Sequence, residues 1–184
     1  MKAAFLAGPL GLCATPALAA AFTDPATGLA IDPPSPFVLR PVRSATYDIA
    51  VVVNSSTGQP PLGPDGTYLC QIGYKVSPAN SALTQEEINL AVARPEWLDN
   101  MAEALSRSFD ITGKTIFVLD GATGVELVGT PKVALQGSAI FISIVDTPAG
   151  RTTVNCSTRP DQLAKALNAF RMIRAGITLP EDPR

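Results

Sequence analysis

The chain has 184 residues with 14 basic and 16 acidic side chains, a weakly acidic balance that argues against a basic nucleic-acid-binding surface. It contains no histidine, which excludes Ser-His-Asp and Cys-His catalysis and the imidazole ligands of most zinc, copper and haem sites. Hydrolysis through paired carboxylates or a Ser-Lys pair stays open.

The N-terminus has the pattern of a secretory signal peptide over residues 1–19. Lys2 precedes an apolar run of roughly ten residues, and Ala17-Leu18-Ala19 fits the small-x-small pattern that signal peptidase recognises. We expect cleavage after Ala19, with Ala21 as the alternative. A transmembrane anchor is the competing interpretation, but the run is shorter than the ~20 residues that a spanning helix needs. The mature chain, 20–184, is then one domain without a transmembrane anchor, periplasmic or secreted.

Three cysteines bear on the redox chemistry of the protein. Cys13 falls inside the predicted signal, and Leu12 before it is not the small residue that bacterial lipoprotein modification favours. Two cysteines then remain, and two cysteines in an exported chain usually pair. We therefore predict a disulfide between Cys70 and Cys156, with two free buried thiols as the alternative. A redox role would favour a Cys-x-x-Cys motif, which the sequence lacks.

The first part of the mature chain is rich in proline and turns. Residues 20–46 are expected to be an extended N-terminal segment, and the β-branched run at 47–53 predicts a central strand. Residues 54–67 follow as a Pro/Gly/Ser-rich loop, about as long as structureless loops become in compact domains. Such a loop is either functional or disordered, and alternation at 68–76 predicts the next strand. The candidate partner-binding residues of the loop are Gln59, Pro60, Pro61, Leu62, Pro64 and Asp65.

The middle of the chain has helical signals. Thr84 and Glu87 have capping-box spacing, and Pro95 predicts a kinked helix or a pair of helices over about 85–108. Trp97 lies beside the apolar face, and we interpret it as core or rim packing ahead of ligand stacking. The predicted apolar face consists of Leu98, Met101, Ala102, Leu105 and Phe109.

The last third of the chain predicts an antiparallel meander and a closing helix. Strands are expected at 115–119, 125–130 (continuing past Pro131), 139–145 and 152–156, with a turn over 120–124. Thr158 is predicted to cap an amphipathic helix that ends near Gly176. One apolar stripe on each helical region and a sheet that needs covering predict an α+β fold. In this fold an antiparallel sheet carries helices packed on its faces, as an α/β/α sandwich.

This order of elements resembles the PsbP-like family, which includes the extrinsic PsbP proteins of photosystem II and the Ran-binding Mog proteins. The resemblance rests on residues 28–37, the meander 115–156 and the closing helix 160–176, and it covers most of the mature chain. The helical region around Pro95 is longer than the family's usual central helix. Members of the family are mostly non-enzymatic binding or assembly factors, so the resemblance implies binding rather than catalysis. None of the family's functional residues transfers to a position in this sequence.

Two groups of charged residues are candidates for chemistry. One group could supply a catalytic carboxylate pair, although solvated turn acids are the simpler interpretation. Its members are Asp120, Glu126 and Asp146. The other group could form an anion patch if the N-terminal segment packs beside the last helix, and scattered surface arginines are the simpler interpretation. Its members are Arg40, Arg43, Arg159, Arg171 and Arg174.

These observations predict an exported, non-catalytic binding or assembly protein of the periplasm. We expect no cofactor, no metal and no nucleic-acid partner, and we expect the partners to be a periplasmic or membrane-associated protein complex. The alternative is a small-molecule-binding protein or a carboxylate-based hydrolase. A deep pocket that holds two acids, one with a raised pKa, would indicate that alternative.

Overall fold

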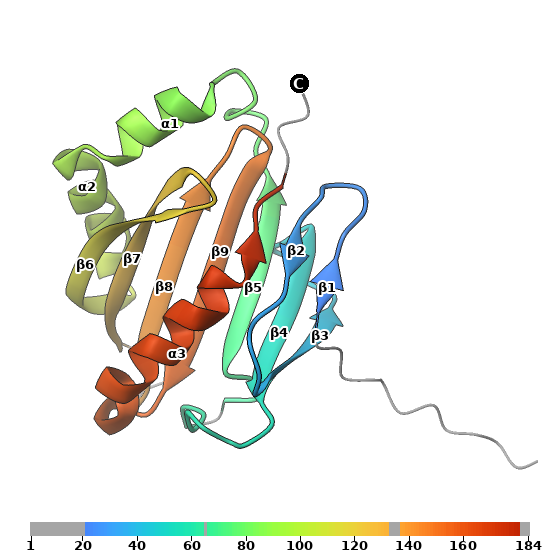
Figure 1. Ribbon diagram of the computed structural model, residues 1–184. Helices are drawn as coiled ribbons and strands as arrows, with labels where there is room; N and C mark the ends of the chain where they lie inside the picture. The colour runs from blue at the N-terminus through green and yellow to red at the C-terminus, as the bar shows by residue number, and fades with distance from the viewer. Residues whose placement is uncertain (1–20, 65, 133–136, 181–184) are drawn as a thin grey trace, which may run out of the picture.

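Segments rich in β-branched residues form one seven-stranded sheet, in which every neighbouring pair of strands is antiparallel. The computed structural model describes residues 21–64, 66–132 and 137–180, so the predicted signal peptide and its cleavage at Ala19 lie outside the described residues. The strand order is β3-β4-β5-β9-β8-β7-β6, shown in Figure 1. The strands are β3 (Phe37–Val42), β4 (Ile49–Ser55), β5 (Cys70–Val76), β6 (Phe109–Leu119), β7 (Ala122–Pro131), β8 (Ala139–Asp146) and β9 (Gly150–Thr158).

A second, three-stranded sheet joins the two ends of the described chain. It consists of β1 (Phe22–Thr23), β2 (Ala30–Ile31) and β10 (Ile177–Thr178), with β2 in the middle. The backbone N–H of Asp32 also donates to the carbonyl of Gly176 at 2.7 Å. The N-terminal segment therefore packs beside the end of the last helix, and the segment expected over 20–46 contains the strands β1, β2 and β3.

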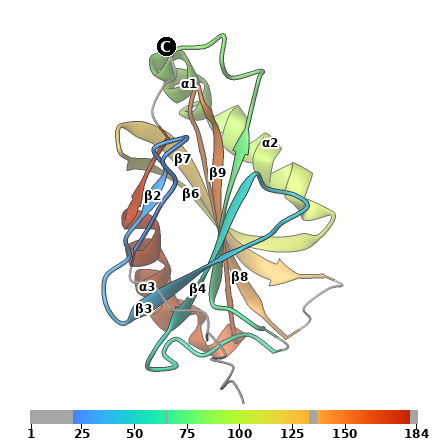
Figure 2. The same cartoon turned by 90° about the vertical axis from the view of Figure 1, so that its right-hand side faces the viewer.

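Helices cover both faces of the large sheet, as Figure 2 shows. They are α1 (Gln85–Val92), α2 (Pro95–Ser106), the 3-10 turn η1 (Pro160–Gln162) and α3 (Leu163–Ala175). Thr84 and Glu87 make the predicted capping box, and Pro95 begins α2 instead of kinking one long helix. Helix α3 lies on one face of the sheet, and α1 and α2 lie on the other. The predicted α+β fold with helices on the faces of an antiparallel sheet is confirmed.

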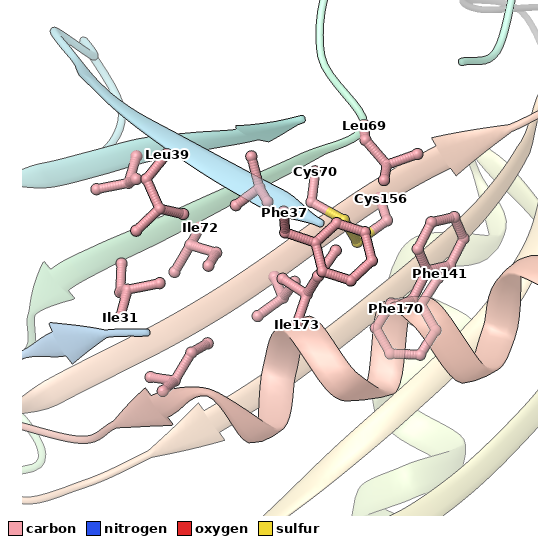
Figure 3. Packing of buried hydrophobic residues seen from close by; sticks show 14 of the residues in the cluster. Ile31, Phe37, Leu39, Leu69, Cys70, Ile72, Phe141, Cys156, Phe170 and Ile173 are labelled. Atoms are coloured by element: carbon pink, nitrogen blue, oxygen red, sulfur yellow. A yellow bond between two sulfur atoms is a disulfide. The ribbon is translucent and has the colours of Figure 1, made fainter. Parts of the chain in front are cut away.

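The larger core lies between the sheet and α3 (Figure 3). Phe170 of α3 packs on Phe141 of β8 with ring centroids 5.6 Å apart, and both side chains are fully buried. Cys70 of β5 and Cys156 of β9 are register partners in this core and form the predicted disulfide. The disulfide therefore joins the middle strands of the sheet, which come from opposite halves of the sequence.

The smaller core lies on the opposite face, under α1 and α2. The alternation of β8 turns Ile140, Ile142 and Ile144 to this side, where they meet Ile88 and Val92 of α1. Helix α2 packs on this core through side chains that are only partly buried, Trp97 among them. Trp97 thus has the packing role that the sequence indicates.

Two helix predictions at the ends of elements are wrong. Helix α2 ends at Ser106, and Phe109 is the first residue of β6 instead of the last residue of the helical face. Phe109 still packs against the smaller core, so its apolar character fits both assignments. Thr158 is the last residue of β9 and caps no helix. Pro160 restricts Arg159 to an extended conformation, so the helical turn begins after Arg159 and Thr158 stays in the strand.

Two loops are also placed differently from the prediction. The turn expected over 120–124 consists of Asp120 and Gly121 alone. Both residues have positive φ angles, which gives a two-residue β-turn, and β7 begins directly after it at Ala122. The loop expected over 54–67 runs over 56–69, because Ser55 still pairs with Phe37 in β4 and β3. The expected continuation of β7 past Pro131 involves residues 133–136, which lie outside the described residues.

Candidate functional site

The loop over 56–69 is held against the body of the protein at several points. At its base, Asn54 Oδ1 accepts the backbone N–H of Leu69 at 2.8 Å. Near its start, the backbone N–H and the hydroxyl of Ser56 both donate to the carbonyl of Pro36. At its middle, Thr158 Oγ1 donates to the carbonyl of Pro61 at 2.7 Å. These bonds give the loop a defined position beside α3.

Gly63 allows the loop to approach the sheet closely. A Cβ atom at this position would lie 2.6 Å from Ser138 Oγ and 3.5 Å from Ser157 Oγ. A side chain at this position would require the Ser138 hydroxyl to move aside, whereas its distance to Ser157 would be an ordinary van der Waals contact. Glycine therefore gives a close approach here that a larger residue could reach only after the Ser138 side chain has moved.

A groove of about 370 Å³ separates the loop from α3; we call it the loop–α3 groove. Helix α3 presents one face to it, at positions spaced as i, i+3, i+4 and i+7. These residues are Lys165, Asn168, Ala169 and Met172. Phe37 of β3, together with the loop itself, completes the apolar part of the wall. Among the described residues that line the groove, Lys165 is the only charged side chain.

The predicted partner-binding residues are divided by the structure. Gln59, Pro60 and Pro61 line the loop–α3 groove. Leu62 follows them and is exposed, as is Pro64, while Asp65 lies outside the described residues. The sequence interpretation missed Met172, which is exposed and lies outside the predicted apolar stripe of the closing helix. An apolar side chain outside the stripe was the signal that could have identified it.

The three candidate acids do not form a carboxylate pair, because each has a separate partner. Asp146 receives two hydrogen bonds of 2.8 Å from Arg151. Asp120 accepts the backbone N–H of Leu179 at 3.3 Å. Glu126 lies on β7 and binds two arginines of α3. Glu126 lines a shallow pocket together with Arg171, without Asp120 or Asp146.

Glu126 is only 2 % exposed and is held by ion pairs. Arg171 Nη2 lies 2.6 Å from Glu126 Oε1, and Arg174 Nη1 lies 2.7 Å from Glu126 Oε2. Arg174 also stacks over the ring of Phe117 at 3.6 Å. Burial by itself would raise the pKa of Glu126, but the hydrogen bonds and charges of Arg171 and Arg174 outweigh it and lower the pKa. A carboxyl with a lowered pKa is the opposite of the proton donor that the hydrolase alternative needs.

The candidate anion patch is also not assembled. Arg40 lies on β3 at one edge of the large sheet, whereas Arg171 and Arg174 bind Glu126 of β7, next to the other edge. Arg159 Nε lies 3.6 Å from Asp161 Oδ1. Arg43 is exposed. The N-terminal segment does pack beside the last helix, but the five arginines are spread over different elements.

Two kinds of feature are missing from the described residues. No group of three or more cysteine, aspartate or glutamate side chains in the described ranges has an arrangement that could hold a metal ion. No helix among the described residues is long and apolar enough to cross a membrane.

Known proteins resemble this chain in fold. No protein-family model matches the sequence, and no curated protein matches it. The solved structure of the cyanobacterial PsbP protein CyanoP from Synechocystis matches with a TM-score of 0.50 and 13% identity, covering 94% of this chain and 98% of its own. The structure of LpqN from Mycobacterium tuberculosis, involved in cell envelope biogenesis, matches with a TM-score of 0.52 and 16% identity, covering 86% and 87%. The PsbP-like fold is therefore confirmed, and the resemblance to Mog proteins stays a prediction.

Proposed function

We propose that this chain is an exported, non-catalytic accessory protein that acts by binding a protein partner through the loop–α3 groove. The observation that carries the proposal is the loop itself. It is hydrogen-bonded into one position, yet it presents proline and leucine side chains at the surface beside an exposed methionine. Pre-positioned loops with exposed apolar residues are suited to binding, because little ordering entropy is lost on association.

Export and an accessory role have separate support. The predicted signal peptide and the Cys70–Cys156 disulfide both fit a chain that folds in an oxidising compartment. LpqN, which shares the fold, is involved in cell envelope biogenesis. The absence of histidine from the sequence and the separate partners of Asp120, Glu126 and Asp146 support a role without catalysis. We place the partner in a periplasmic or membrane-associated complex.

The chemistry of the groove defines the partner segment. Phe37, Ala169 and Met172 offer an apolar surface, and Lys165 offers a positive charge at the same wall. A segment that inserts one apolar side chain and places an Asp or Glu carboxylate near Lys165 would complement both. The partner segment in this proposal is therefore apolar and acidic.

Site-directed photo-crosslinking in the producing cells tests the proposal. A photoreactive residue at the exposed position Gln59 should give one discrete protein adduct, and the same residue at exposed Leu90 of α1 serves as the matched control. Adding Met172→Glu should abolish the adduct from position 59, because it places a like charge beside the acidic segment of the partner. Deleting residues 57–62 should remove the partner from pull-downs while the fold survives. Equal adducts from positions 59 and 90, or a deletion variant that retains every partner, would contradict the proposal.

A further inference from the structure

A second hollow lies on the opposite face of the large sheet, beneath the C-terminal end of α2. Its floor is the apolar row of β8, namely Ile140, Ile142 and Ile144, and its wall includes Leu105 and Phe109. It has a volume of about 340 Å³; we call it the α2 cavity. It shares no lining residue with the loop–α3 groove.

The α2 cavity exists because the two helices cover only part of this face. Figures 1 and 2 show α1 and α2 over the β6–β7 end of the sheet. No side chain of α2 is fully buried, although its apolar face points at the smaller core. Ile142 and Ile144 are each 8 % exposed to solvent, whereas Phe141, which points from the same strand towards α3, is completely buried. The isoleucine row is thus buried, but it still lines the α2 cavity.

The other side of the α2 cavity is polar but uncharged. Thr153, Asn155 and Ser157 alternate along β9 and line it together with Tyr68. Asn155 Nδ2 donates to Tyr47 Oη at 3.2 Å, and among the described residues Asn155 Oδ1 and Thr153 Oγ1 make no hydrogen bond. No charged side chain is present among the described residues that line the cavity. Neutral donors and acceptors therefore stand next to an apolar floor.

We infer that the α2 cavity binds a neutral single-chain amphiphile, with the alkyl chain on the isoleucine row of β8 and the uncharged polar head beside Asn155 and Thr153. The volume lies at the lower end of the roughly 300–1,000 Å³ found for small-molecule pockets. It is too small for a helix of a partner protein, which has a diameter of about 10–12 Å with its side chains. A charged head is disfavoured, because no opposite charge lines the cavity to offset its desolvation.

Binding of octyl glucoside below its micelle concentration, followed by isoleucine methyl NMR, tests the inference on the mature chain. The methyl signals of Ile140, Ile142 and Ile144 should shift in a saturable manner. The signals of Ile72 and Ile173, which lie in the larger core on the other face, should stay in place. Shifts that are spread equally over both faces, or that do not saturate, would overturn the inference.

Two variants and two further probes sharpen the test. Leu105→Trp fills the cavity from α2 and should weaken binding by at least about tenfold, whereas Met172→Trp, in the loop–α3 groove, should leave it unchanged. Asn155→Leu removes the polar contact to the head and should also weaken binding. This second variant keeps the test valid if Leu105→Trp fails to fold. Octanoate and octyltrimethylammonium should bind at least about tenfold more weakly than octyl glucoside. The inference would be refuted if the charged probes bound as tightly as octyl glucoside. It would also be refuted if both Leu105→Trp and Asn155→Leu bound octyl glucoside as tightly as the native sequence.

Discussion

At the scale of single residues, Glu126 shows how a charge can be kept inside the fold. Its carboxylate bonds to Arg171 and Arg174, and the ion pairs tie β7 to α3 across the sheet face. Arg171 keeps about half of its side-chain exposure, but Arg174 keeps only 12%. The loss of Glu126 would therefore leave a nearly buried guanidinium without its partner, which is costly.

Glu126→Ala should lower the free energy of unfolding by about 3 kcal/mol, because breaking a buried ion pair exposes the desolvation cost of the remaining charge. Urea denaturation measures this loss. Asp110→Ala is the matched control, since its ion pair with Lys132 is exposed and should contribute less than about 1 kcal/mol. Similar losses in the two variants would show that the Glu126 cluster contributes no more than a surface pair.

Removing the charge of Glu126 should also change the pH dependence of stability. The folded pKa of Glu126 is lowered, so its contribution is present at neutral pH and is lost as the pH falls below the ordinary glutamate pKa of about 4.3. The difference in unfolding free energy between the native sequence and Glu126→Gln should therefore shrink between pH 7 and pH 3. A difference that does not change with pH would contradict the ion-pair explanation.

At the scale of elements, Thr158 of β9 links the sheet to the loop over 56–69. Its hydroxyl is buried and donates to the carbonyl of Pro61. Thr152, near the start of the same strand, has a buried hydroxyl without a hydrogen-bond partner among the described residues. The two threonines therefore form a natural pair for comparing a bonded with an unbonded hydroxyl.

Thr158→Val should lower the unfolding free energy by about 1 kcal/mol and speed proteolysis within the loop, because it removes one anchor and leaves the Pro61 carbonyl unpaired. Limited proteolysis with mass spectrometry, together with urea denaturation, measures both effects. Thr152→Val should be neutral or stabilising, since it removes a buried polar group that has no partner. Loop cleavage at an unchanged rate in Thr158→Val would show that the other anchors suffice.

The elements also show what the sequence could predict. The β-branched runs and turn residues correctly predicted the four-stranded meander, and the capping box with Pro95 correctly predicted a helical region that is interrupted at Pro95, because these signals are local. Phe109 was misassigned because an apolar residue suits either a helix or a strand, and its pairing with Pro131 of β7 decided between them. Thr158 was misassigned because Pro160 moves the start of the helical turn beyond Arg159. Of the residues that line the loop–α3 groove, Gln59, Pro60 and Pro61 were among the predicted loop residues. The contribution of Met172 and the α2 cavity depend on how distant elements pack, which no local pattern encodes.

At the scale of the whole molecule, the large sheet consists of two antiparallel units. One unit is β3-β4-β5, the other is the meander β6 to β9, and β5 and β9 pair along their lengths. The disulfide crosses this boundary between residues 86 positions apart. In the chain-entropy account, a closed loop of this length stabilises the fold by about 4–5 kcal/mol, with engineered disulfides often giving less.

Cys70→Ala with Cys156→Ala should therefore be destabilised by up to about 4 kcal/mol while keeping the same fold. Urea denaturation under oxidising conditions measures the loss. Reductant should destabilise the native sequence by a similar amount and leave the double variant unchanged, which separates the bond from packing effects. Alkylation of the denatured, non-reduced protein should find neither thiol of the mature chain, and two reactive thiols would contradict the pairing.

The pairing of β5 with β9 also sets an order of events during synthesis. A ribosome makes the chain from the N-terminus, so β3, β4 and β5 exist long before β9, and β5 has an unpaired edge until residues 150–158 are available. Long-range strand pairing is intrinsically slow, and an unpaired strand edge can bind another chain. The central sheet can close only when most of the chain has been made. A newly made chain therefore lacks the closed central sheet for most of its synthesis, which fits the export proposed above.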